Sequence, residues 1–390
     1  MLVHAWPEGR PRILVADAWL ANAGDGAIAI ATERRLRRMA PRAAILHAAY
    51  QGDLLADAYP ELALVPPLAG LVAVTPSIPE MRGWDGDAAG RIVAEADLVL
   101  SQGGGFAMEH YRPWERLRAW ELVVQLGAPI AFCAQSVGPF RHDRERAILR
   151  RVYARAVVVG LREERSAANV LDLGVEPERV VVAADEAFSL FPTDPVADGA
   201  RSGYACVLSA HSWLLEDGSI VEPGEGLAEL AAIVTALVRL GEGERVTLMS
   251  TQQGLHSLER GLEDDAELAE RVIASLPAEV AQFVRTVPGY LAPMQCMDLI
   301  AAHRGLISMR MHPAIFGLGG GVPTVLLTDA FKARAMFEML GLESALCGWA
   351  DRSEAVPRLA SSHGRVPGLD EARTRAAAND EVVRRLLEAL

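Results

Sequence analysis

Short apolar runs alternate with longer amphipathic stretches along most of the chain. The runs are rich in β-branched residues and end near turn residues, whereas the stretches between them have the 3.6-residue period of helices. Strands are predicted at 12–19, 43–50, 96–105, 129–139, 156–162, 179–185, 204–211, 245–253, 282–287, 305–310 and 322–327. Helices are predicted at 24–40, 227–241, 263–276 and 293–303. Regular alternation of strands and helices predicts parallel, doubly wound sheets in an α/β fold.

One segment interrupts this alternation. LFPTDPVADGARSGY, residues 190–204, has two prolines, two glycines and no apolar period, which is typical of a linker between domains. We therefore expect two Rossmann-like domains, at 1–193 and 194–369, and a C-terminal helix at 370–390 that can pack back on the first domain. Ligands of such sheets bind beyond the carboxyl ends of the strands, so the active site is expected in the interdomain cleft.

The composition fits this organisation. The 390 residues are too many for one typical core, and 51% apolar with 23% charged residues is usual for a globular enzyme. The formal net charge of −13 argues against nucleic acid as a partner, because phosphate binding needs a basic surface. No apolar run reaches the length of a membrane span, and no signal peptide is evident at the N-terminus.

The four cysteines are scattered and form no CxxC pair. Reduced thiols in a cytoplasmic protein are the simple interpretation, and a structural zinc site is not expected. The carboxylates form no evident cluster either, so no metal is expected. The cysteines are Cys133, Cys206, Cys296 and Cys347.

The strongest candidate for chemistry is SMRMHPA, at the end of the strand predicted at 305–310. Pro313 suits the first turn of a helix, so Arg310 and His312 are expected beside a helix N-terminus, which favours anions. Alternation along the strand places both side chains on one side of its end. A planar cation beside an acid–base group suits a phosphate or a carboxylate. The alternative is a structural histidine with an arginine at the rim.

Two glycine-containing turns are further candidates. NAGDGAI places Asp25 where backbone N–H groups at a helix start attract anions, although Asp25 alone suits an N-cap. SQGGG ends a predicted strand with Gly103, Gly104 and Gly105, a helix is expected to follow, and glycine lets a backbone approach a ligand. The alternative for these glycines is a tight turn. Neither stretch has the spacing of a dinucleotide-binding or Walker motif.

Three more polar residues lie at predicted strand ends or strand–helix corners. Arg162 ends the strand at 156–162, and its alternative is a solvated side chain beside neighbouring glutamates. Lys332, the only lysine of the chain, stands at the corner after the last strand, where a surface position is the alternative. Gln252 lies near the end of the strand at 245–253 and completes the candidate substrate-binding residues.

Taken in order, these stretches resemble the polysaccharide pyruvyl transferase family over about residues 12–343. The matching segments are NAGDGAI, DLVLSQGGG, AQSVGPF, LREERSAANVLDLG, ADEAFSL, ISMRMHPAIFGLGGGVP and DAFKARAMFEMLGL. The resemblance implies a GT-B-like fold, phosphoenolpyruvate as the donor and a sugar diol as the acceptor, with a pyruvate ketal as the product. It also implies that Arg162, Arg310 and His312 bind the donor and catalyse its reaction.

The residue types suit that chemistry. Phosphoenolpyruvate carries a phosphate and a carboxylate, which calls for several fixed cations such as Arg162, Arg310 and Lys332. Addition at C2 requires a proton at the C3 methylene, and His312 can supply one near neutral pH. The scheme needs no metal and no cofactor beyond the donor substrate.

Three alternatives stay open. A GT-B glycosyltransferase would use a nucleotide sugar, with Glu338 as a candidate partner for the ribose. A repurposed family member would act on a small natural-product scaffold, and a non-catalytic paralogue would only bind an anion. The expected partners are a small-molecule donor and a saccharide acceptor, and a homo-oligomer is left open.

Overall fold

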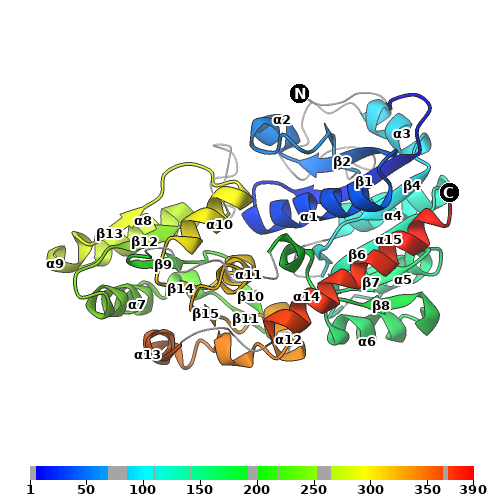
Figure 1. The fold of residues 1–390 in the computed structure, drawn as a ribbon. Coiled ribbons are helices and arrows are strands. Elements are labelled where there is room, and N and C mark those ends of the chain that lie inside the picture. The colour runs from blue at the N-terminus through cyan, green and yellow to red at the C-terminus, as the bar shows by residue number, and fades with distance from the viewer. Residues whose placement is uncertain are drawn as a thin grey trace. The chain divides into compact units, whose positions relative to one another are not determined.

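The computed structural model describes residues 6–68, 86–108, 111, 113–140, 142–191, 201–215, 217, 219–252, 265–362 and 368–390. The chain forms two compact units, each built on a parallel sheet (Figure 1). The first unit comprises Met1–Leu20, Asp25–Ser189 and Arg373–Leu390, and the second comprises Ala21–Gly24 and Leu190–Ala372. The domain bounds 1–193, 194–369 and 370–390 stay a prediction, and much of the expected linker, 192–200, lies outside the described residues.

The first unit contains an eight-stranded sheet whose path is β3-β2-β1-β4-β6-β7-β8, with β5 paired to β6. Its strands are β1 (Arg12–Trp19), β2 (Ala44–Tyr50), β3 (Leu64–Val65), β4 (Leu98–Ser101), β5 (Gly104–Ala107), β6 (Ile130–Val137), β7 (Val159–Leu161) and β8 (Val180–Val182). Its helices are α1 (Ala23–Met39), α2 (Gly52–Leu55), α3 (Gly86–Ala94), α4 (Trp114–Gln125), α5 (Asp143–Tyr153), α6 (Glu164–Asp172), α14 (Leu369–Ala377) and α15 (Asn379–Leu387). The first residues of α1 and of α14, up to Gly24 and Ala372, belong to the second unit.

The second unit has a six-stranded sheet in the order β13-β12-β9-β14-β15-β16 and a small antiparallel pair, β10-β11. The strands are β9 (Tyr204–Val207), β10 (Trp213–Leu214), β11 (Ile220–Val221), β12 (Val246–Met249), β13 (Val284–Thr286), β14 (Gly305–Ser308), β15 (Thr324–Leu327) and β16 (Leu346–Cys347). The helices are α7 (Leu227–Leu240), α8 (Asp265–Ser275), α9 (Ala278–Ala281), α10 (Pro293–Ala301), α11 (Met311–Gly319), α12 (Phe331–Met339) and α13 (Ala355–Ser361).

The two sheets share one topology. In each sheet, the strands that follow the first strand are added on one of its sides, and later strands are added on its other side. The strand order therefore reverses between β1 and β4 and between β9 and β14. The pairs within both sheets are parallel. The predicted α/β class with doubly wound parallel sheets is therefore confirmed. Ligands of such sheets bind where the order reverses, beyond the carboxyl ends of the strands.

Two predicted elements differ from the structure. The strand predicted at 96–105 is two strands, because the chain leaves the sheet after β4 and β5 then pairs in parallel with β6. Gly104 makes this possible with a positive φ of 151°, and the next helix begins only at Trp114. The helix predicted at 370–390 is two helices separated at Ala378, and the buried Asn379 amide donates to the carbonyl oxygen of Ala184, which fixes α15.

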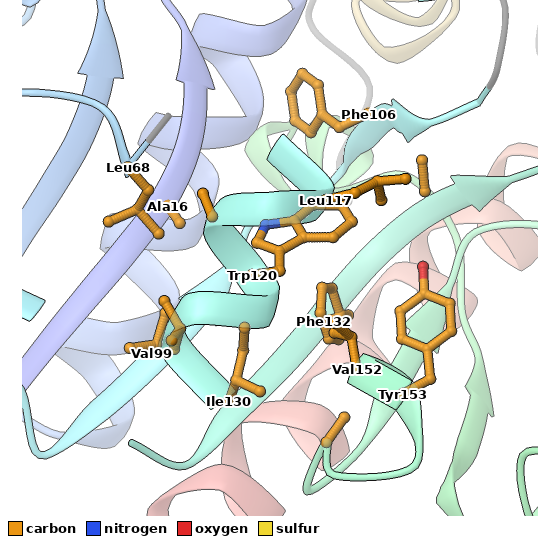
Figure 2. Packing of buried hydrophobic residues seen from close by; sticks show 14 of the residues in the cluster. Ala16, Leu68, Val99, Phe106, Leu117, Trp120, Ile130, Phe132, Val152 and Tyr153 are labelled. Carbon is orange, nitrogen blue, oxygen red and sulfur yellow. The ribbon is translucent and has the colours of Figure 1, made fainter. Parts of the chain in front are cut away.

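Alternating side chains give the first sheet an apolar layer on each face. Leu14 on β1 contributes to a core under α3, α4, α5 and α6, whereas its neighbour Ile13 contributes to a second core under α1 and α15. In the first of these cores Trp120, Phe132 and Tyr153 meet edge to face, with ring centroids 5.0 and 4.9 Å apart (Figure 2). These rings anchor α4 and α5 on the sheet.

A buried histidine makes the stability of the second unit pH-dependent. His303 Nδ1 lies 2.7 Å from the Leu299 carbonyl oxygen and Nε2 lies 3.0 Å from Thr247 Oγ1, which also accepts a hydrogen bond from Arg285. Burial lowers the pKa of His303 from its ordinary value of 6.5, and the charge of Arg285 adds to this effect. The folded chain therefore holds His303 neutral at a pH where the unfolded chain binds a proton.

We expect the free energy of unfolding to decrease as the pH falls below 6.5 toward the lowered pKa of His303. In His303→Gln this part of the pH dependence should disappear, even though the variant loses some stability at every pH. Urea denaturation at several pH values between 8 and 5 measures both slopes. His142→Gln, which replaces an exposed histidine, is the control, and equal slopes in wild type and His303→Gln would contradict the assignment.

Candidate functional site

The Arg-x-His pair lies at the carboxyl edge of the second sheet, where the strand order reverses. Arg310 follows β14 and is the N-cap of α11, and His312 is the second residue of that helix. The Ser308 hydroxyl fixes the turn, since it accepts from the Arg310 N–H at 3.1 Å and donates to the Arg310 carbonyl oxygen at 2.6 Å. Arg310 and His312 are partly exposed while Met309 and Met311 are buried. The predicted in-and-out alternation therefore holds, although the helix already begins at Met311.

The guanidinium of Arg310 donates two hydrogen bonds to the buried carboxylate of Asp265. Its Nε donates to Asp265 Oδ2 at 2.5 Å and its Nη2 donates to Oδ1 at 2.6 Å, and Oδ1 also accepts from the Ala210 N–H at 3.0 Å. Burial raises the pKa of Asp265, and the charge of Arg310 opposes that rise. The Nε–Nη2 edge of the guanidinium, expected to bind the donor, is thus held by Asp265. This partner begins α8 and had no distinguishing sequence signal.

His312 packs against the start of α1, whose second residue is Gly24. A Cβ atom at position 24 would overlap the imidazole ring, so the absence of a side chain at Gly24 makes room for His312. Directly before this helix lies Asn22, whose Oδ1 accepts from the Gly24 N–H at 2.8 Å and whose Nδ2 donates to Gln252 Oε1, also at 2.8 Å. Gln252 and His312, two predicted site residues, therefore contact one short segment at this edge of the sheet.

We expect Gly24→Ala to displace the His312 ring and to lower any turnover that depends on it, while the backbone at position 24, which has no positive φ, accepts alanine. The measurement is a double-mutant cycle of turnover with His312→Ala. If Gly24 acts by making room for His312, the alanine should cost little once His312 is gone. Additive losses in the double variant would show that Gly24 acts through something else.

Lys332 lies at the next corner along the same edge. It is the second residue of α12, which follows β15, and β15 is the parallel neighbour of β14. On the other side, Thr251 follows β12, and its buried hydroxyl has no hydrogen-bond partner within the described part of the chain. The carboxyl edge of the second sheet thus presents a cation, an acid–base group and an unsatisfied hydroxyl.

Arg162 belongs to the first unit and is almost completely buried, with 1% of its surface exposed. Its Nη1 donates to Asp185 Oδ2 at 2.6 Å, its Nε donates to Ser136 Oγ at 2.7 Å, and Glu163 Oε2 lies 3.8 Å away. Although burial opposes the charge, Asp185 and Glu163 raise the pKa of Arg162 above its ordinary value. The solvated alternative for Arg162 is therefore wrong. Its role in donor binding, and its convergence with Arg310 and His312, stay predictions.

Asp25 lies in the first turn of α1, and its charge helps to raise the pKa of Arg162. The N-cap alternative for Asp25 is wrong, because the helix begins at Ala23 and the Asn22 side chain accepts the Gly24 N–H. Asp25 and Arg162 are thus electrostatically coupled at the carboxyl edge of the first sheet. Substrate binding by Asp25 stays a prediction.

The three consecutive glycines allow close packing within the first unit. A Cβ at Gly103 would lie 3.1 Å from the Ala134 carbonyl oxygen, and one at Gly104 would overlap the Phe106 ring. The helix expected directly after them is replaced by β5, which starts at Gly104 and includes Gly105. Beside them, Gln102 Oε1 is buried with no hydrogen-bond partner among the residues that the structure describes. Ligand contact by the glycine backbone stays a prediction.

Other chemistry finds little support in the described residues. They contain no group of three or more His, Cys, Asp or Glu side chains arranged to hold a metal ion. The four cysteines are free and buried, and burial raises the pKa of Cys206 and of Cys296 to about 12, which disfavours the nucleophilic thiolate. Among the described helices, none has both the length and the apolar character that crossing a membrane requires.

The protein has two doubly wound units, and each has polar side chains where its strand order reverses. This arrangement defines a GT-B-like α/β protein. The chain belongs to the polysaccharide pyruvyl transferase family, whose pattern matches residues 22–329. This confirms the resemblance inferred from the ordered motifs. The match includes every candidate site residue except Lys332, which lies just beyond its end.

One relative is the amylovoran biosynthesis protein AmsJ of Erwinia amylovora, 24% identical in an alignment of 259 residues that covers 63% of this chain and 60% of AmsJ. The chain therefore aligns with less than two thirds of the length of AmsJ.

Solved structures with a similar fold are much more distant in sequence. They include MnaA of S. aureus with UDP (11% identity, 97% and 98% of the two chains, TM-score 0.60). Another is the UDP-GlcNAc 2-epimerase of Neisseria meningitidis bound to UDP-GlcNAc (11%, 97% and 100%, TM-score 0.59). A third is HepE of Anabaena with UDP (12%, 97% and 98%, TM-score 0.57). These similarities show the fold alone and confirm the predicted GT-B-like class.

Proposed function

We propose that this protein transfers the pyruvyl group of phosphoenolpyruvate to two hydroxyls of a sugar acceptor in polysaccharide biosynthesis, forming a pyruvate ketal. The observation that carries the proposal is the Arg310–His312 corner at the N-terminus of α11, inside the segment that matches the family. A helix N-terminus favours an anion, and this one presents a cation and an acid–base group together.

Donor binding needs positive charge for a phosphate and a carboxylate. Arg310 supplies a guanidinium whose orientation Asp265 fixes through two hydrogen bonds, and the helix N-terminus adds backbone N–H groups. Lys332 supplies an ammonium at the adjacent corner. Gln252 and the Thr251 hydroxyl are candidates for the uncharged contacts to the donor. In this proposal Arg162 and Asp25 bind substrate at the carboxyl edge of the first sheet.

His312 moves the protons of the proposed reaction. As an imidazolium it protonates C3 of phosphoenolpyruvate while the first acceptor hydroxyl forms a bond to C2, which turns the methylene into a methyl group. The neutral imidazole then takes up the proton of the first hydroxyl, and the proton of the second hydroxyl leaves with the phosphate. The second hydroxyl replaces phosphate at C2, so the products are the ketal and inorganic phosphate. Arg310 stabilises the negative charge of the departing phosphate.

A nucleotide-sugar glycosyltransferase is the main rival. That activity would call for a carboxylate to hold the ribose, and Glu338 was the candidate. In the structure Glu338 Oε1 lies 3.5 Å from Nη2 of Arg334, so this carboxylate already has a cationic neighbour. Action on a small natural-product scaffold would use the same donor chemistry, and a non-catalytic paralogue would bind the donor without turnover.

A thermal-unfolding screen distinguishes the two donors. Phosphoenolpyruvate should raise the apparent stability by about 2.7 kcal/mol at a concentration 100 times its Kd, whereas UDP-GlcNAc should leave it unchanged. Inorganic phosphate at the same concentration is the control for a general anion effect. Stabilisation by UDP-GlcNAc but not by phosphoenolpyruvate would overturn the proposal.

A further inference from the structure

A groove between α4 and α5 of the first unit is lined by an aromatic ring and several arginines. None of the residues assigned to the proposed reaction lines it. The two helices pack against each other over the Trp120 core. The groove has a volume of about 480 Å³, within the range of small-ligand sites. Its lining is formed by Trp114, Arg118, Arg144, Ala147, Ile148 and Arg151.

Trp114 provides a fixed aromatic surface in this groove. It is the first residue of α4, is partly buried, and packs against the apolar core that underlies both helices. The guanidinium carbon of Arg144 lies 3.0 Å from the ring centroid and that of Arg118 lies 6.0 Å from it. Arg144 is exposed at the start of α5, so its long side chain can leave the ring for an incoming anion.

The groove is rich in positive charge, and part of this charge is held in place. Glu121 is 7% exposed and accepts two hydrogen bonds from Arg151, at 2.6 and 2.8 Å, and one from Arg118. Two of the three guanidinium groups that line the groove thus share one carboxylate, and the third, Arg144, lies over the Trp114 ring, which leaves an excess of positive charge. In a chain with a net charge of −13, such a cluster concentrates anions locally.

We propose that this groove binds an acidic saccharide, a sugar unit that carries a carboxylate. The apolar C–H face of a pyranose ring suits the indole of Trp114, and a carboxylate suits the planar donors of Arg144 and Arg118. The inference rests on the proposed function, because each pyruvate ketal adds a carboxylate to the saccharide. The groove would therefore bind units of the polymer that already carry a carboxylate. Other units of the same polymer would meanwhile receive the pyruvyl group.

The position of the groove agrees with this role. β5 precedes α4 and β6 precedes α5, so both helices begin near the carboxyl edge of the first sheet. Trp114 and Arg144 lie in the first turns of α4 and α5, at the end of the groove nearest that edge. Substrates of doubly wound sheets bind at this edge. One extended saccharide can therefore contact both the groove and the carboxyl edge of the first sheet.

Isothermal titration with trigalacturonate and with maltotriose, in the absence of phosphoenolpyruvate, tests the proposal. Trigalacturonate carries three carboxylates and maltotriose is a neutral trisaccharide, so only the first should bind. We expect Arg144→Gln and Trp114→Leu each to weaken the binding of trigalacturonate about tenfold, since each removes one of the assigned contacts. Arg384→Gln, which removes a similarly exposed arginine from α15, should leave binding unchanged.

Three results would overturn the proposal: equal binding of both trisaccharides, unchanged binding of trigalacturonate to Arg144→Gln, or equally tight binding of tripolyphosphate to the same residues. Because Trp114 contacts the core, a circular dichroism spectrum should first show that Trp114→Leu is folded, and Arg144→Gln tests the groove without touching the core. Pyruvyl transfer to a monosaccharide acceptor is measured separately. A wild-type protein that transfers the pyruvyl group but does not bind trigalacturonate refutes the groove alone, and absent transfer refutes the proposed function.

Discussion

His312→Ala is expected to lower kcat with phosphoenolpyruvate by about 10²–10⁴, the usual contribution of a positioned acid or base. The Kd of the donor should change much less, because the guanidinium of Arg310 and the N-terminus of α11 remain in place. Steady-state kinetics with a verified acceptor gives kcat, and calorimetric titration of phosphoenolpyruvate gives the Kd.

His142→Ala, the loss of an exposed histidine before α5, is the matched control and should keep wild-type turnover. Wild-type turnover in His312→Ala would mean that His312 is structural and that the proposed proton transfer is wrong. A large loss of donor affinity with unchanged kcat would assign His312 to binding.

Asp265→Ala is expected to lower the free energy of unfolding by about 3 kcal/mol, because it leaves the Arg310 guanidinium in a largely buried place without its carboxylate. Donor affinity should fall as well, since the two hydrogen bonds that orient Arg310 are lost. Urea denaturation measures the first effect and titration with phosphoenolpyruvate the second.

Glu229→Ala is the matched control for Asp265→Ala. It breaks an exposed pair with Arg352 and should cost less than about 1 kcal/mol. Stability should partly return in Asp265→Ala/Arg310→Met, where no unpaired charge is left. Equal stability of Asp265→Ala and wild type, or no recovery in the double variant, would show that the pair does not fix Arg310.

The long periodic elements could be predicted from the sequence, and the short ones could not. β1 and α7 have eight and fourteen residues, enough to display an apolar period, and the predicted ranges match them closely. β10 and β11 have two residues each, too few for any period. β5 exists because Gly104 turns the chain back against β6, and this depends on a tertiary contact that local sequence does not reveal.

The candidate site shows the same division between local and long-range information. The corner with Arg310 and His312 was predictable, because an apolar strand, two polar residues and a proline follow one another in the sequence. The partners of these residues were not. Asp265 is 45 residues from Arg310, and Gly24 meets His312 from the other end of the chain. Such contacts are set by the packing of the sheet and its helices.

Arg162 shows how a local interpretation fails. Beside Glu163 and Glu164 it has the sequence context of a surface ion pair, yet its main partner is Asp185, 23 residues away and fully buried. The charged pair forms because β7 and β8 are adjacent and parallel, and Asp185 follows β8 just as Arg162 follows β7. Sheet topology, which only the structure supplies, decides the partner.

The most direct test of the central claim follows the fate of phosphoenolpyruvate labelled with ¹³C at C2 and C3. Incubated with the protein and a panel of pyranosides, it should give a ketal carbon and a methyl group in the NMR spectrum, with one phosphate released per ketal and none without an acceptor. His312→Ala should reduce both signals together. Turnover of UDP-GlcNAc with the same acceptors, while labelled phosphoenolpyruvate stays unchanged, would contradict the account.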